Sequence, residues 1–259
     1  MGIGAVAVIV VLVLLGVIRA DNLAPIVIGV TVVAAIAYFA VILSSRRIDG
    51  TERSRVWGFL PLFVTSVAFW SLYQQQFTVP TVYSDERLNR DLFGWEMPVS
   101  WVQSINPVFI IILSGVFAAL WTRLGKRQPS TPAKFGLRAI INGSAFLLFL
   151  PFARGWPHSP PLLAIVGILF VFTVAELLLS PVGLSVTTKL APKVFHTQMV
   201  ALFFLSVALG TAISGWLVGY YDPENEVPYF SILGGIAIVV GIGLLLSIKP
   251  VLKLMRGVH

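Results

Sequence analysis

The stretch LLAIVGILFVFTVAELLLSPVGLSV, residues 162–186, decides the fold of this chain. Its apolar residues extend beyond the roughly 20 residues that an α-helix needs to cross the hydrocarbon core of a bilayer. It also contains Glu176, the only acidic residue inside any apolar run of the sequence. A charged side chain at the bilayer centre costs roughly 2.5 to 3.5 kcal/mol, so such residues usually mark a path for ions, protons or substrate. The alternative is a protonated carboxyl group hydrogen-bonded between helices.

The composition places the whole chain in the same class. Of its 259 residues, 57% are hydrophobic and 11% are charged, and the mean hydropathy is +0.92. Soluble domains have about 25% charged residues. We therefore expect an all-α integral membrane protein with eight transmembrane helices, near residues 2–19, 25–44, 57–79, 101–121, 137–153, 161–186, 197–220 and 229–248. The first run lacks a basic leader and is interpreted as a span rather than a cleaved signal peptide.

The net charge of +7 follows membrane topology rather than nucleic-acid binding, so no nucleic-acid partner is expected. One set of alternate loops, with the C-terminal tail, holds 14 of the 18 basic residues: Arg46, Arg47, Arg53, Arg55, Arg123, Lys126, Arg127, Lys134, Arg138, Lys189, Lys193, Lys249, Lys253 and Arg256. The other set holds Arg19, Arg87, Arg90 and Arg154 together with eight acidic residues. The positive-inside rule then predicts a multi-pass protein of the cell (inner) membrane with both termini in the cytoplasm.

The chain divides into three parts. Residues 1–45 are expected to form two plain packing helices, residues 46–56 a cytoplasmic linker, and residues 57–259 a bundle of six helices. The six later runs hold nearly all the aromatic, polar and helix-breaking residues, so the functional site is expected there. Cysteine is absent, which excludes disulfides, thiolate catalysis and cysteine metal sites.

Two runs of the bundle present polar groups that apolar packing does not require. In residues 58–80, Trp70, Gln74 and Phe77 fall at i, i+4 and i+7, which predicts one helix face with Trp70 walling a cavity. The alternative is an interfacial aromatic belt with amide pairs between helices. In the next run, Asn106 precedes Pro107, which cannot donate to the carbonyl group of the residue four positions earlier. The pair Asn106 and Pro107 can therefore be interpreted either as the polar wall of a pocket or as a purely structural kink.

The stretch that contains Glu176 repeats this pattern. Ser180 lies four residues later on the same face, and Pro181 leaves the carbonyl group of Leu177 without its helical donor. A carboxyl group in that setting can exchange a proton for a bound cation. No lysine or arginine is placed in a span, because Arg138 is assigned to a loop. The counter-charge of Glu176 is therefore expected to come from outside the chain.

Taken together, the motifs resemble the proton-dependent oligopeptide transporter family of the major facilitator superfamily. The resemblance covers residues 57 to about 220. FWSLYQQQ (69–76) is similar to the family's seventh-helix motif, QSINP (103–107) to its eighth, ELLLSPVGLSVTTKLAP (176–192) to its tenth and QMVALFFLS (198–206) to its eleventh. TRLGKR (122–127) resembles a loop signature of the superfamily. The first two runs resemble the helix pair that bacterial members insert between their six-helix halves.

The resemblance implies that Glu176 and Asn106 receive the amino terminus of a di- or tripeptide, with Ser180 nearby, Trp70 and Phe203 as walls, and Gln74 one turn from Trp70. It also implies that Glu176 couples to the proton gradient and that no cofactor is needed. Two positions depart from the family pattern. The family often has an acid where this chain has Gln74, and often tryptophan where it has Phe203.

A larger departure is that the family's amino-terminal six helices have no counterpart in this sequence. We therefore expect the carboxy-terminal half of a proton-coupled peptide symporter, as a fragment, a split gene product or a truncated chain, that does not transport without the amino-terminal half. A non-transporting membrane scaffold is the alternative. An intramembrane enzyme is disfavoured, because His158 and His196 fall in loops and His259 at the terminus, leaving no second titratable group in a span beside Glu176.

Overall fold

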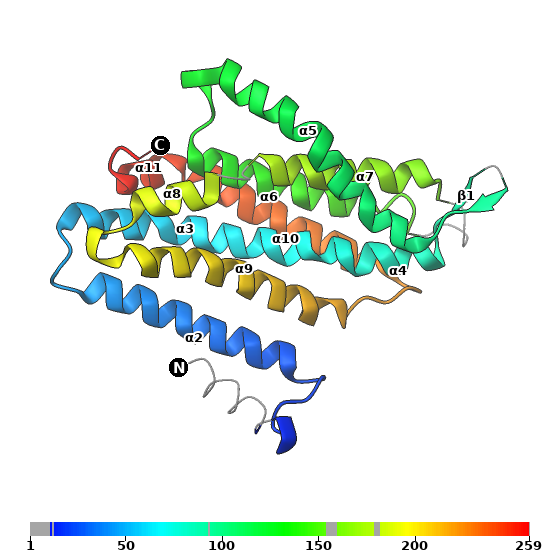
Figure 1. Cartoon of the computed structure of the whole chain (residues 1–259), viewed down its shortest axis with the longest axis horizontal. Helices are drawn as coiled ribbons and strands as arrows, with labels where there is room; N and C mark the ends of the chain where they lie inside the picture. The colour runs from blue at the N-terminus through cyan, green and yellow to red at the C-terminus, as the bar shows by residue number, and fades with distance from the viewer. Residues whose placement is uncertain (1–10, 12, 93, 154–159, 179–181, 259) are drawn as a thin grey trace.

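Most of the long helices run side by side along the long axis of the molecule, and α5 lies at an angle to them (Figure 1). The structure is a computed structural model that describes residues 11, 13–92, 94–153, 160–178 and 182–258. Its long helices are α2 (Leu23–Ser44), α3 (Gly50–Tyr73), α5 (Val102–Leu124), α6 (Thr131–Leu147), α7 (Leu162–Leu177), α9 (His196–Val218) and α10 (Glu226–Leu246). The shorter elements are η1 (Gln74–Phe77), α4 (Val79–Glu86), β1 (Asp91–Leu92), β2 (Trp95–Glu96), η2 (Val99–Trp101), η3 (Gly125–Arg127), α8 (Val182–Leu190), η4 (Lys193–Phe195) and α11 (Ile248–Met255).

Six helical segments among the described residues are long and apolar enough to cross a membrane. They are Leu23–Ser44, Gly50–Glu86, Val99–Leu124, Leu162–Leu190, Lys193–Val218 and Glu226–Leu246. An all-helical, multi-pass membrane protein is thereby confirmed. The count of eight is not, since the first expected run falls mostly on residues outside the described ones, and α6 has 17 residues and is not among the six.

The residues between α2 and α3 include a helix start signal. Asp49 caps α3, because its Oδ1 accepts from the backbone N–H of Glu52 (2.7 Å) while its own N–H donates to Glu52 Oε2 (3.2 Å). Helix α3 therefore begins at Gly50, and part of the stretch 46–56 is helical. The domain boundaries predicted from the sequence stay predictions.

The run expected near residues 57–79 is not one helix. The α-helical part ends at Tyr73, residues Gln74–Phe77 wind more tightly as η1, and α4 starts at Val79. The break is favoured because Pro80 has no N–H to continue the helical ladder, and the N–H of Thr78 instead bonds the nearer carbonyl group of Gln75 (2.9 Å). The single α-helical face predicted for Trp70, Gln74 and Phe77 does not extend to Phe77, which lies at the end of η1, whereas Trp70 and Gln74 both contact α9.

Glycines allow a close helix contact between α6 and α10. A Cβ atom added to Gly143 would lie 2.6 Å from the carbonyl oxygen of Gly234, and one added to Gly241 would lie 2.6 Å from that of Gly136. Two pairs of facing glycines thus let the backbones touch, as small residues do between membrane helices. This contact sets the position of α6 along α10. Helix α6 carries Arg138, which lies against Phe69 of α3.

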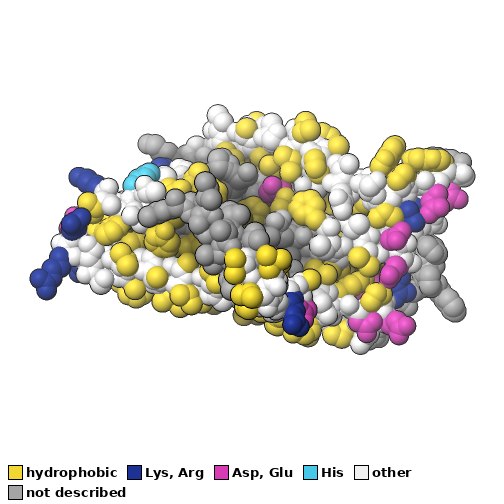
Figure 2. Space-filling view, turned by 60° about the horizontal axis from the view of Figure 1, so that its bottom comes forward, with side chains coloured by type: hydrophobic (Ala, Val, Ile, Leu, Met, Phe, Trp, Pro, Cys, Tyr) yellow, Lys and Arg dark blue, Asp and Glu magenta, His cyan; other side chains and the backbone are white. Residues whose placement is uncertain are grey.

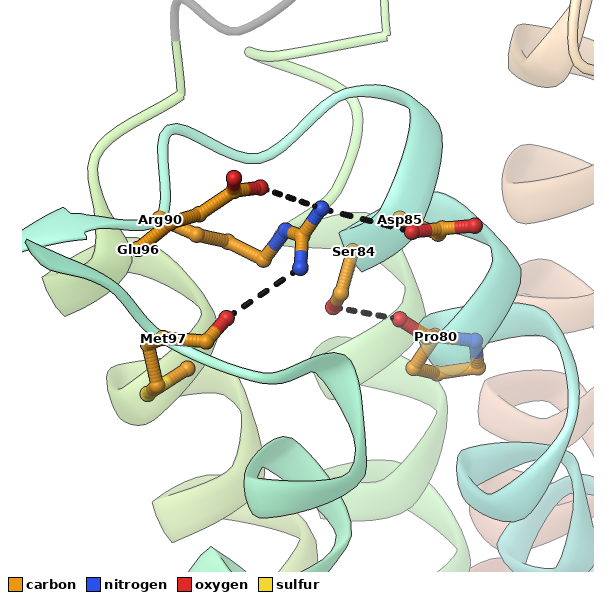
Figure 3. A network of polar contacts seen from close by, with 6 residues as sticks. All are labelled: Pro80, Ser84, Asp85, Arg90, Glu96 and Met97. Carbon is orange, nitrogen blue, oxygen red and sulfur yellow. Dashed lines mark hydrogen bonds and ion pairs between the residues drawn. The ribbon is translucent and has the colours of Figure 1, made fainter.

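The two ends of the molecule differ in charge (Figure 2). Most of the visible Lys and Arg side chains gather at one end and most Asp and Glu side chains at the other, in agreement with the alternation of loop charge. At the acidic end, the β1–β2 hairpin pairs Asp91 with Glu96. Arg90 ties this hairpin to α4, since it lies 2.8 Å from Glu96 Oε1 and 3.4 Å from Asp85 Oδ1 and donates to the carbonyl group of Met97 (Figure 3).

Candidate functional site

Glu176 lies in the last turn of α7 and is half-buried against the end of α3. The hydroxyl group of Tyr73, the last residue of α3, donates a short hydrogen bond to Glu176 Oε2. The Tyr73 ring also stacks on Phe69, with ring centroids 5.2 Å apart, and both residues form a small buried cluster with Ala175. The carboxylate is therefore held by its own chain in a fixed orientation, at the point where two helices end.

Asn106 reaches the same helix from the other side. It is 3% exposed, and its Nδ2 donates to Thr173 Oγ1 (3.0 Å) on α7, one turn before Glu176. Thr173 in turn donates to the carbonyl group of Leu169 (2.9 Å). Helix α5 runs through Pro107 without interruption, so the residue contributes no break in the helix. The roles that the sequence predicts for Asn106 and Glu176 in one pocket stay predictions.

Trp70 and Gln74 face α9. A Cβ atom added to Gly210 would lie 2.5 Å from Trp70 Cβ, so α9 approaches α3 closely at this level because Gly210 has no side chain. Gln74 Nε2 donates to Thr211 Oγ1 (3.2 Å), one residue further along α9. The Trp70 ring meets Tyr73 edge to face with centroids 5.4 Å apart. Trp70 therefore lies next to the Tyr73–Glu176 contact, while the Gln74 amide is engaged by α9.

The other two glutamines of η1 have opposite environments. Gln75 is fully satisfied, since its Nε2 donates to the carbonyl group of Ser214 (3.0 Å) and its Oε1 accepts from Tyr229 Oη (2.9 Å). Gln76 is 3% exposed, and neither atom of its amide group has a partner. A buried amide without partners costs free energy, so Gln76 is a group that a water molecule or a ligand would stabilise.

Of the two remaining predicted site residues, the structure describes Phe203 and not Ser180. A Cβ atom on Gly183 would lie 2.9 Å from the Phe203 ring, so Phe203 packs against the first turn of α8. This places the Phe203 ring just beyond the boundary between α7 and α8. Ser180 and Pro181 lie outside the described residues, which resume at Val182. The interruption predicted at Pro181 therefore also lies outside the described residues.

Arg138 is the site residue that the sequence analysis missed. Helix α6 starts at Thr131, earlier than the expected residue 137, and Arg138 is only 6% exposed inside it. The guanidinium carbon lies 3.1 Å from the centroid of the Phe69 ring and 5.3 Å from that of Trp70. The expectation that no basic residue enters the bundle is corrected by this finding. The signal was present in Ser130, Thr131 and Pro132, which are typical of a helix start.

A buried acid is also found at Glu226, which the sequence places among the eight acidic residues of the second set of loops. Glu226 is fully buried at the start of α10, pairs with Arg87 Nε at 3.5 Å and accepts from Tyr221 Oη at 2.8 Å. Burial, followed by this hydrogen bond to Glu226, raises the pKa of Tyr221. The phenol therefore stays protonated and donating at any physiological pH. This cluster lies at the acidic end of the bundle and anchors α10 to α4.

The described residues contain no group of three or more His, Cys, Asp or Glu that could hold a metal ion. What the site offers is a half-buried carboxylate with a phenol donor, an amide tied to the neighbouring turn, and an aromatic wall. Such a carboxylate can accept a proton or bind an ammonium group. A carboxylate held inside a bundle of membrane helices is typical of ion, proton or substrate paths.

The chain belongs to the POT family, since the family's sequence profile matches residues 18–233. This confirms the resemblance found in the sequence motifs. The chain is 43% identical over 226 residues to the uncharacterized transporter YclF of Bacillus subtilis (strain 168), covering 86% of this chain and 46% of that protein. It is 39% identical over 234 residues to the di-/tripeptide transporter of Lactococcus lactis subsp. cremoris, covering 88% of this chain and 47% of the relative.

Solved structures of the family have the same fold. A glutamate-to-glutamine mutant of a peptide transporter POT in complex with sulfate superimposes with a TM-score of 0.90 at 41% identity, over 99% of this chain and 53% of that one. A POT family transporter in complex with 5-aminolevulinic acid gives 0.87 at 34% identity, over 96% and 53%. The chain therefore spans about half the length of the relatives and structures that it matches.

Proposed function

We propose that this chain is the carboxy-terminal half of a proton-coupled di-/tripeptide symporter and supplies the side of the pocket that receives the peptide's amino terminus. The observation that carries the proposal is Glu176, a half-buried carboxylate at the end of α7 that Tyr73 orients. The family and the di-/tripeptide transporters among the relatives support the substrate class. The share of those relatives that is matched, about half, supports a half-transporter that needs a partner half.

The residue roles follow from this placement. Glu176 binds the peptide ammonium group and is coupled to the proton cycle, so the energy source is the proton gradient and no cofactor takes part. Asn106 adds a polar contact from α5, with Ser180 near the carboxylate. Trp70 and Phe203 form walls. Gln74 stands where the family often has an acid, which leaves Glu176 as the carboxylate of this half of the pocket.

The membrane arrangement is part of the proposal. Residues 1–45 form two inserted helices and residues 57–259 the six-helix half, giving eight spans in the cell (inner) membrane with both termini in the cytoplasm. The separation of charge between the two ends supports this orientation (Figure 2). Cysteine accessibility at Ser45 and at Asn225, in cells and in inverted vesicles, tests it. Labelling of Asn225 from the cytoplasmic side would contradict it.

Complementation tests the function. The chain is co-expressed with the amino-terminal half of the Lactococcus relative, and proton-driven uptake of a dipeptide is measured in vesicles. Glu176→Ala is expected to abolish uptake. Glu224→Ala removes an exposed acid of the loop before α10 and is the matched control, expected to leave uptake unchanged. Full uptake by the Glu176→Ala variant, at equal membrane abundance, would overturn the proposal.

A further inference from the structure

Arg138 poses an energetic problem that the proposed function leaves open. Its guanidinium group is buried in α6, and its Nε has no hydrogen-bond acceptor. None of the ion pairs within 4.0 Å among the described residues includes it. A buried charge without compensation is strongly unfavourable, so something in its surroundings must stabilise the cation.

Two kinds of group surround this cation. The Phe69 and Trp70 rings lie at 3.1 Å and 5.3 Å from the guanidinium carbon, close enough for cation–π attraction. Behind them, the Tyr73 ring stacks on Phe69 and its hydroxyl group donates to Glu176. The negative charge of the Glu176 carboxylate favours the positive charge of Arg138. One aromatic layer thus separates a buried cation on α6 from the carboxylate on α7.

We propose that Arg138 is the internal counter-cation of Glu176 and sets how strongly this half of the pocket attracts a ligand's ammonium group. In the empty site the charge of Glu176 is partly balanced through the aromatic layer. The carboxylate therefore attracts the ammonium group of a ligand less strongly than an isolated carboxylate would. The difference in affinity between ligands with a free amino group and N-acylated ligands is correspondingly smaller. The statement about ligands rests on the proposed function, whereas the pairing of the two residues does not.

Other elements at the site contribute no competing charge among the described residues. Helix α3 contributes Tyr73, which is a hydrogen-bond donor to the carboxylate. Helix α5 contributes the neutral Asn106, through Thr173. The other buried cation of α6, Lys134, is one turn earlier and is engaged elsewhere, since its Nζ donates to Gln128 Oε1 (2.8 Å) and lies 4.3 Å from the centroid of the Trp121 ring. Lys134 is therefore a matched control for Arg138.

The pairing is tested on the isolated chain by a double-variant cycle. Arg138→Leu, Glu176→Gln and the double variant are purified in detergent, and their unfolding midpoints are measured. We expect the double variant to lose much less than the sum of the two single losses, because residues that interact do not act additively. The same cycle with Lys134→Leu and Glu176→Gln should be additive. Additive losses in the Arg138 cycle would overturn the pairing.

The effect on ligands is tested in the complemented transporter. The KM values of a dipeptide and of its N-acetylated form are compared. Arg138→Leu should raise the preference for the free amine about tenfold, which corresponds to about 1.4 kcal/mol, and Arg138→Lys should keep the wild-type ratio. An unchanged ratio in Arg138→Leu would overturn the inference about ligands. Absence of uptake by the unaltered chain would count against the proposed function alone, because the unfolding cycle still tests the pairing.

Discussion

Two adjacent glycines of α10 should respond in opposite ways to the same substitution. A Cβ atom at Gly234 would lie 2.8 Å from the carbonyl oxygen of Gly143 and 2.8 Å from Leu147 Cδ2, whereas one at Gly235 would have no atom of another helix within 4 Å. Alanine improves helix propensity at either position by up to about 1 kcal/mol. At Gly234 it also forces α10 away from α6, and overpacking of this kind costs about 1 to 3 kcal/mol.

We therefore expect Gly235→Ala to stabilise the chain by up to about 1 kcal/mol and Gly234→Ala to be less stable than Gly235→Ala by about 1 to 3 kcal/mol. The assay is equilibrium unfolding in mixed micelles, followed by the loss of helical circular dichroism. Both variants add the same methyl group to the same helix, so differences in expression or micelle binding cancel. Equal stability of the two variants would refute the close α6–α10 contact.

Three further predictions concern single hydroxyl or amide groups. Tyr73→Phe removes a hydrogen bond to the Glu176 carboxylate and should lower the free energy of unfolding by about 1.5 to 3 kcal/mol; a wild-type value would show that the bond does not form. Because the pKa of Tyr221 is raised by burial and by its bond to Glu226, its contribution to stability is present below the unfolded value of about 10 and is lost at higher pH, so the Tyr221→Phe variant should show a smaller alkaline loss in a pH series of thermal scans. Asn106→Leu should weaken dipeptide uptake in the complemented transporter while membrane abundance is unchanged, and normal uptake would exclude the amide from the pocket.

The membrane class could be predicted because it depends on local sequence. Runs of apolar residues identify spans whatever their neighbours are, and an acid inside such a run is conspicuous. The placement of Asn106 and Glu176 in one pocket was implied by the family resemblance and stays a prediction. The contact of Asn106 with Thr173 then follows from α5 lying beside α7.

Other parts of the site depend on contacts between distant segments and were out of reach. Arg138 sits near the start of its run and reads as a loop residue until α6 is seen to begin at Thr131 and to be drawn inward against α10. Glu226 reads as an interfacial acid until its burial against Arg87 is seen. The predicted α-helical face of Trp70 and Gln74 does not continue to Phe77 for a local reason, because η1 winds more tightly than an α-helix.

The η1 segment has a mechanical consequence. Tightly wound breaks are often regarded as joints at which one helix swings freely about another. Here the movement of η1 is restricted, because the Gln75 side chain is hydrogen-bonded to Ser214 on α9 and to Tyr229 on α10 at the same time. Force applied to α4 is then passed sideways to two neighbouring helices as well as along α3. The acidic ends of these helices should therefore tilt together as one rigid unit, because Gln75 links them.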